Sequence, residues 1–118
     1  MKVTIFGATG FSGQAILADS IKQGHEVTIL VRDASKIPIK HQNLTIVEGN
    51  VLNPQTVASV LHHQEAVIQC LGVSGKGDGK PTTFISDATK IIVDEMQNQK
   101  IKRLIAMSNV GAGNSIAF

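Results

Sequence analysis

The chain has 118 residues, of which 42% are hydrophobic and 17% charged, and this composition is typical of a folded globular domain and unlike that of a disordered chain. The net charge of +2 includes no dense basic run, which argues against a nucleic-acid binder, and no apolar run reaches the ~18 residues that a membrane span requires. A single cysteine, Cys70, excludes an internal disulfide and fits a reducing compartment. We therefore predict one cytoplasmic domain over residues 1–118, with neither nucleic acid nor membrane as a partner.

The first segment combines a β-branched run with a glycine motif. Val3 and Ile5 predict a strand, and glycines follow it in the spacing G-x-x-G-x-x-G. Gly7 allows a tight turn, Gly10 removes a Cβ where a pyrophosphate must come close, and Gly13 lets the next helix pack against the strand. The N-terminus of that helix favours an anion. The motif alone indicates a phosphate site, not a particular nucleotide.

The remaining elements alternate between strand and helix. One helix follows the glycine turn and ends at Gly24, a second begins at Asn53-Pro54, and a third begins at Thr82 or Thr83. The strands after the first are predicted at residues 27–31, 44–47, 66–71 and 104–107. Continuous apolar strands are typical of a parallel sheet that is covered on both faces. We predict an α/β fold, a Rossmann-like doubly wound parallel sheet of five strands in the order 3-2-1-4-5.

The chain stops about ten residues after the fifth predicted strand, where a full dinucleotide fold continues into another helix and strand. We expect residues 1–118 to be the N-terminal, C-terminally truncated part of a longer protein. The alternative is a natural minimal domain. Its open fifth strand would then need a partner, such as a second copy in a homo-oligomer, to cover the exposed sheet edge.

The tip of the second predicted strand carries the residues that distinguish the two nicotinamide cofactors. In a dinucleotide fold, the residue about 20 positions after the glycines contacts the ribose 2′ position. Arg32 stands 19 residues after Gly13 (32 − 13), and Lys36 follows one helical turn later, so two cations can converge on a 2′-phosphate. NADP is therefore predicted over NAD, and Asp33 keeps NAD open. The alternative interpretation of Arg32 and Lys36 is a solvated loop.

Six blocks of the chain occur in a specific order, namely FGATGFSG, VRDASKIP, EGNVLNP, AVIQCLG, KPTTFISDATKIIVDEM and KRLIAMSNVGAG. With these blocks the chain resembles the NADPH-dependent flavin reductase and biliverdin-IXβ reductase group of the atypical short-chain dehydrogenases, close to NmrA-like proteins. The resemblance covers nearly the whole chain. It implies an NAD(P)-binding Rossmann domain, NADPH as the cofactor, and a flavin or similar small-molecule acceptor.

The resemblance also implies which residues bind the cofactor. Arg32 and Lys36 would hold the 2′-phosphate. Asn50, followed by Val51, stands where the family has an acid that binds the adenine amino group, and an amide oxygen can still accept that hydrogen bond. The pyrophosphate would contact Gly7, Thr9, Gly10, Phe11, Ser12 and Gly13. The nicotinamide ribose would lie over Leu71, Gly72 and Val73.

Ser108 is the catalytic candidate and a further cofactor contact. It ends the fifth predicted strand, and open α/β sheets bind ligands outside the carboxyl ends of their strands. Its hydroxyl could bind the nicotinamide amide or the acceptor, or could only satisfy the end of the strand. The group commonly has a second hydroxyl residue next to it, where this chain has Asn109.

The chain contains no Tyr, so the Tyr-x-x-x-Lys pair of standard short-chain dehydrogenases is excluded within these 118 residues. A flavin or linear tetrapyrrole can accept hydride with little more than correct stacking, which favours flavin reduction over alcohol oxidation. Alternatively, the Tyr lies in a missing C-terminal half. Two further functions stay open: a non-catalytic NADP-binding redox sensor of the NmrA-like type, and a sugar or phenolic-ether reductase with catalytic residues beyond Phe118.

Two other features predict no site. His62 and His63 lack a cluster of further ligands, and their side chains are expected to point in different directions, so we predict no metal site. Cys70 lies in an apolar strand without a nearby cation, which predicts a buried, inert thiol.

Overall fold

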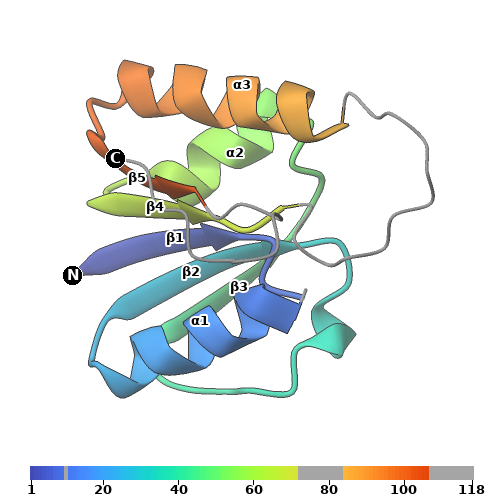
Figure 1. Ribbon diagram of the computed structural model, residues 1–118, viewed down its shortest axis with the longest axis vertical. Coiled ribbons are helices and arrows are strands. Elements are labelled where there is room, and N and C mark those ends of the chain that lie inside the picture. Colours follow the sequence, from blue (N-terminus) through green and yellow to red (C-terminus); the bar gives the residue numbers. More distant parts are fainter. Residues whose placement is uncertain (10, 72–83, 107–118) are drawn as a thin grey trace.

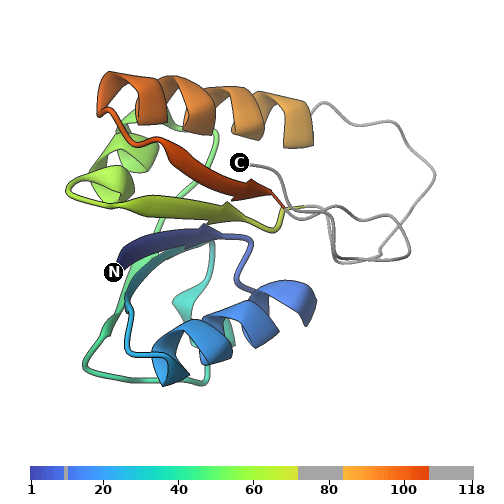
Figure 2. The same cartoon turned by 60° about the vertical axis from the view of Figure 1, so that its left-hand side comes forward.

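The structure is a computed structural model that describes residues 1–9, 11–71 and 84–106, and it has three layers (Figure 1). The middle layer is a parallel sheet. Helix α1 (Phe11–Lys22) covers one face, and helices α2 (Pro54–Leu61) and α3 (Phe84–Asn98) cover the other. Figure 2 shows the same separation of the helices from the side.

The sheet has the predicted topology. Its strands are β1 (Lys2–Phe6), β2 (Glu26–Val31), β3 (Leu44–Glu48), β4 (Ala66–Gln69) and β5 (Arg103–Ala106). All neighbouring strands are parallel, and their order is β3-β2-β1-β4-β5. This order confirms the doubly wound, Rossmann-like fold. It also brings the carboxyl ends of all five strands to one edge of the sheet.

Helix boundaries follow from local chemistry. The N-terminus of α2 is capped by Asn53, whose side-chain oxygen accepts hydrogen bonds from the backbone N–H groups of Gln55 (2.9 Å) and Thr56 (3.4 Å). Pro54 occupies the first helical position, as predicted. After α1, Gly24 adopts a left-handed φ of +86° and its N–H donates to the carbonyl of Ile21. The predicted start of the third helix, at Thr82 or Thr83, lies outside the described residues.

Strand β4 is shorter than predicted, ending at Gln69 instead of Leu71. The N–H of Cys70 still donates to the carbonyl of Phe6 at 2.8 Å. Beyond that bond β1 has ended and the chain turns away at Gly7, so Leu71 has no residue of β1 to pair with. The end of β1 therefore limits the pairing between β4 and β1.

Successive side chains of the central strands point to opposite faces of the sheet, and the helices on each side bury both sets. In β1, Ile5 packs on the α1 side and Phe6 on the side of α2 and α3. In β2, Ile29 and Leu30 repeat this alternation. Continuous apolar strands are what two covered faces require.

Side-chain hydrogen bonds link the sheet to helices α2 and α3. The buried Thr4 hydroxyl donates to the carbonyl of Val60 in α2 at 2.7 Å. At the carboxyl end of β4, the Gln69 amide donates to the Thr89 hydroxyl in α3 at 2.7 Å. These bonds satisfy polar groups that would be costly to bury alone, and they fix α2 and α3 against the strands.

The outer strands β3 and β5 are more exposed than the central three. Association of two copies through the edge at β5 stays a prediction. Among the described residues, no helix has the length and apolar character to cross a membrane.

Candidate functional site

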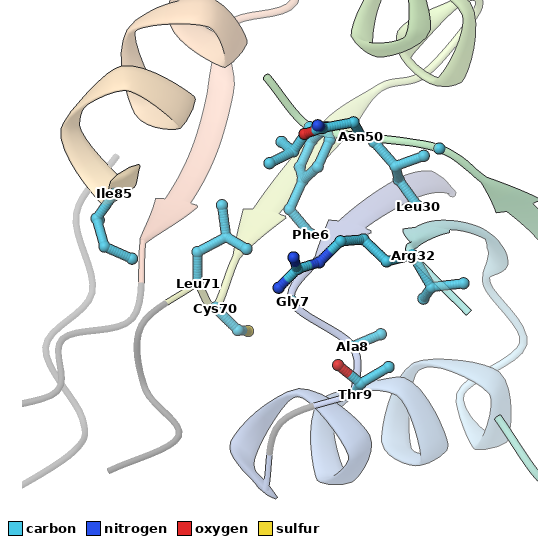
Figure 3. A pocket seen from close by; sticks show the side chains of 13 residues that line it. Phe6, Gly7, Ala8, Thr9, Leu30, Arg32, Asn50, Cys70, Leu71 and Ile85 are labelled. Carbon is cyan, nitrogen blue, oxygen red and sulfur yellow. The ribbon is translucent and has the colours of Figure 1, made fainter. Parts of the chain in front are cut away.

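A cavity of about 320 Å³ opens at the carboxyl edge of the sheet (Figure 3). Each of the first four strands contributes the residues at its end: Gly7 after β1, Arg32 after β2, Asn50 after β3 and Leu71 after β4. Ile85, in the first turn of α3, completes one wall. Because open α/β sheets bind ligands outside the carboxyl ends of their strands, this cavity is the candidate site.

Two glycines at the base of the cavity, Gly7 and Gly13, have no space for a side chain. Gly7 has a φ of +85°, and a Cβ there would lie 2.7 Å from the carbonyl carbon of Cys70. A Cβ on Gly13 would overlap the carbonyl oxygen of Gly7. The first turn of α1 therefore packs directly on the turn after β1, in agreement with the predicted roles of both glycines.

The other predicted pyrophosphate residues lie around the same turn. Thr9 is exposed and lines the cavity, and its carbonyl accepts a hydrogen bond from the Gln14 amide at 2.9 Å. Phe11 and Ser12 belong to the first turn of α1, but their side chains lie outside the described residues, as does Gly10. Thr9 lines the cavity and α1 begins two residues later, at Phe11. A helix N-terminus favours an anion.

Arg32 and Lys36 leave β2 together but reach different places. Arg32 is exposed and lines the cavity, and Figure 3 shows its side chain extending over the turn at Gly7. Lys36 ends the short 3-10 helix η1 (Ala34–Lys36), is also exposed, and is not among the residues that line the cavity. The structure thus brings one of the two predicted cations to the cavity.

Asp33 lies between the two cations in the sequence, and its side chain forms hydrogen bonds within the local turn. Its Oδ1 accepts hydrogen bonds from the hydroxyl (2.6 Å) and the backbone N–H (3.0 Å) of Ser35. These bonds, with a smaller contribution from the charge of Lys36, hold the pKa of Asp33 below its ordinary value. Asp33 caps η1 as an ionised carboxylate and does not line the cavity.

Asn50 and Val51 follow the third strand. The Asn50 side-chain oxygen accepts a hydrogen bond from the N–H of Leu52 at 2.8 Å, which fixes the orientation of the side chain. An amide oxygen has a second acceptor position, and the amide nitrogen can donate. Val51 is buried and lines the cavity. The side chain at position 50 can therefore still bind an amino group such as that of adenine.

The predicted nicotinamide side of the site is only partly described. Leu71 is half-buried, packs against the core and lines the cavity. Gly72, Val73 and the catalytic candidate Ser108 lie outside the described residues.

Several lining residues were not predicted as site residues, namely Phe6, Ala8, Leu30, Val31, Gly49, Cys70 and Ile85. Most are apolar and belong to strand ends that also form the core. Some of them could have been predicted because they are adjacent in sequence to predicted site residues: Phe6 directly precedes Gly7, and Val31 directly precedes Arg32. Ile85 has no such signal, because α3 approaches the cavity only in the fold.

Cys70 is buried, with 3% of its surface exposed, and desolvation raises the pKa of its thiol to about 11. The sequence predicted a buried, inert thiol, and both observations agree with it.

Iodoacetamide is expected to leave Cys70 unmodified in the native protein at pH 8, because its thiol stays neutral there. Labelling followed by mass spectrometry should accelerate only in denaturant or as the pH approaches about 11. Since the unfolded thiol ionises near 9.0, the folded state binds more protons between these values, and its stability should fall as the pH rises through them. Equal labelling of native and unfolded protein at pH 8 would contradict the burial.

Within the described ranges, no group of three or more His, Cys, Asp or Glu side chains could hold a metal ion. The expectation that His62 and His63 point apart was wrong. Their ring centroids lie 3.8 Å apart. His63, which follows α2, has a left-handed φ of +63°.

A second cavity, of about 690 Å³, lies on the α1 side of the sheet. Its floor consists of apolar residues from β1, β4 and β5, including Val3, Ile68 and Ile105, and its rim includes Asp19 of α1. The loops after the strands do not contribute to it. The cavity at the strand ends therefore remains the candidate site.

A family model described as NAD(P)H-binding matches residues 7–118. The uncharacterized protein YwnB of Bacillus subtilis (strain 168) is 30% identical over 112 residues, which are 95% of this chain and 49% of YwnB. Phenylcoumaran benzylic ether reductase TP7 of Nicotiana tabacum is 31% identical over 86 residues, which are 65% of this chain and 28% of the reductase.

Among solved structures, the chain is similar to a short-chain dehydrogenase/reductase (wide type) from Veillonella parvula DSM 2008 in complex with NADP. The TM-score is 0.75 and the identity 27%, with 93% of this chain and 48% of that one covered. The chain thus spans about half the length of YwnB and of the Veillonella protein.

Proposed function

Because this chain belongs to the NAD(P)H-binding family, we propose that it is an NADPH-dependent oxidoreductase that transfers hydride to a flavin or a similar conjugated acceptor. The observation that carries the choice of NADPH is the position of Arg32, at the cavity and over the glycine turn. A guanidinium binds a phosphate through its positive charge and several N–H groups. The free 2′-hydroxyl of NADH has no charge for an arginine to bind.

The residues around the cavity fit a nicotinamide dinucleotide. Gly7 allows the tight turn after β1, and Gly13 lets α1 pack directly on that turn, which is how a dinucleotide fold brings a helix N-terminus to the pyrophosphate. On this proposal Arg32 binds the 2′-phosphate, Asn50 binds the adenine amino group, and Leu71 supports the nicotinamide ribose. Bound NADPH would supply the hydride, and the chain would hold its reactive end against the acceptor.

The choice of a conjugated acceptor is supported by the lack of a Tyr proton donor in residues 1–118. None of the 118 residues is Tyr, so these residues supply no phenol to exchange a proton with an alcohol or ketone. A conjugated ring system accepts hydride when it is stacked correctly, and its proton can come from water. Ser108 remains our proposed contact to the nicotinamide amide or to the acceptor.

The test is to follow NADPH oxidation by the full-length protein under anaerobic conditions, with and without added FMN or riboflavin. We expect NADPH loss that depends on the flavin, and little turnover with NADH. Tight NADPH binding without turnover of any acceptor would instead support an NADP-binding redox sensor of the NmrA-like type.

A second candidate function is favoured by the similarity to phenylcoumaran benzylic ether reductase TP7. In that case the acceptor is a phenolic ether, and residues outside this chain complete the catalytic site. NADPH consumption with such an ether and none with flavin would identify this function. A Tyr-x-x-x-Lys sequence in the remainder of the protein would point the same way.

A further inference from the structure

The turn that carries Arg32 is attached to the neighbouring strand by a carboxylate. Glu48 is the last residue of β3 and pairs in register with Val31, the last residue of β2. Its Oε2 accepts a hydrogen bond from the backbone N–H of Ala34 at 2.8 Å. Since Ala34 is two residues beyond Arg32, this bond fixes the path of the chain directly after the proposed 2′-phosphate contact.

The side-chain hydrogen bonds of Asp33 are local. Among the described residues, its carboxylate accepts hydrogen bonds only from Ser35, two residues away, and these bonds shape the start of η1. Ala34 also packs against the core on the α1 side of the sheet. Glu48 instead reaches across from a strand 14 residues later in the sequence. Loss of the Glu48 bond would therefore leave the turn folded locally but less well fixed to the end of β3.

The Glu48 carboxylate also places a negative charge close to the turn. It is exposed, and it lies within hydrogen-bonding distance of a backbone group near Arg32. A 2′-phosphate at Arg32 would be repelled by this charge, weakly because solvent screens it. The hydrogen bond and the charge thus have opposite effects on NADPH binding, and a test must separate them.

We propose that Glu48 is a positioning residue for cofactor selectivity, which holds the Arg32 turn through its hydrogen bond to Ala34 and so favours NADPH over NADH. The inference rests on the proposed function, because the position of Arg32 affects selectivity only if Arg32 binds the 2′-phosphate. Glu48 does not line the cavity and need not touch the cofactor.

Two substitutions separate the hydrogen bond from the charge. Glu48→Ala and Glu48→Gln remove the same charge, but only Gln retains an oxygen that can accept the Ala34 N–H. The dissociation constants of NADPH and NADH are measured for both variants of the full-length protein by titration calorimetry. Selectivity is the dissociation constant of NADH divided by that of NADPH. We expect this ratio to be about two- to tenfold lower in Glu48→Ala than in Glu48→Gln.

The dissociation constant of NADH shows whether a variant is misfolded. A poorly folded variant would bind both cofactors less tightly, and the ratio of the two dissociation constants would stay the same. Glu26→Ala and Glu26→Gln are matched controls, since Glu26 is exposed at the opposite end of β2, and they should leave the ratio unchanged.

Equal ratios in the two Glu48 variants, together with a lowered ratio in Arg32→Ala, would overturn the positioning role and leave the proposed function intact. An unchanged ratio in Arg32→Ala would instead overturn the proposed 2′-phosphate site, and the role of Glu48 with it.

Discussion

Arg32→Ala is expected to weaken NADPH binding about ten- to a hundredfold while changing NADH binding little, because charge-assisted hydrogen bonds to a phosphate contribute about 1.5–3 kcal/mol. Arg32 lies over the glycine turn at the cavity, and only NADPH has a 2′-phosphate for it to bind. The measurement is the dissociation constant of each cofactor, at low and at high salt. The difference between wild type and variant should shrink as salt screens the pair.

Arg103→Ala is the matched control for charge, because Arg103 is an exposed arginine at the start of β5, away from the carboxyl edge of the sheet. It should bind both cofactors like the wild type. If Arg32→Ala weakened NADH and NADPH equally, the arginine would support the fold of the site without reading the 2′-phosphate.

Gly7→Ala is expected to destabilise the protein far more than Gly24→Ala, although both glycines have nearly the same left-handed φ, +85° and +86°. At Gly24 an added Cβ meets nothing within 4 Å, so the variant pays only the backbone strain, about 1–2 kcal/mol. At Gly7 the added Cβ also meets the Cys70 backbone, whose carbonyl carbon would lie 2.7 Å away. The total cost there should exceed about 4 kcal/mol.

Urea unfolding of the two variants measures this difference directly. The stability of Gly24→Ala should remain measurable, whereas Gly7→Ala should unfold at much lower urea or fail to fold. Equal losses of stability would mean that the loop after β4 can move away from the turn after β1, and that the two do not pack as closely as described.

Much of the fold could be predicted because its signals are local. Asn53-Pro54 marked the start of α2 to the residue, and the apolar run of β2 indicated a strand covered on both faces. The end of β4 could not be predicted in this way. Its last hydrogen bond to β1 runs from the N–H of Cys70 to the carbonyl of Phe6. That bond depends on the place where β1 turns away, at Gly7, which lies 64 residues (71 − 7) before the predicted strand end at Leu71.

The same distinction applies to the site. Gly7 and Arg32 were predicted from their positions after strands and Asn50 from the family resemblance, and the structure brings all three to one cavity. Lys36 was expected beside Arg32, but η1 carries it away from the cavity lining. The bond between Glu48 and Ala34 had no sequence signal, because it depends on the register of β3 against β2.

The candidate cavity is assembled from the ends of four strands and the start of α3, so no short segment of the chain contains it. An unfolded chain would therefore have almost no affinity for a cofactor that the folded sheet binds. Cofactor binding and folding then become linked equilibria, and a concentration of cofactor 100 times its dissociation constant would add about 2.7 kcal/mol to the stability of the fold. The amount of folded protein in a cell would accordingly follow the supply of its cofactor, with or without catalysis.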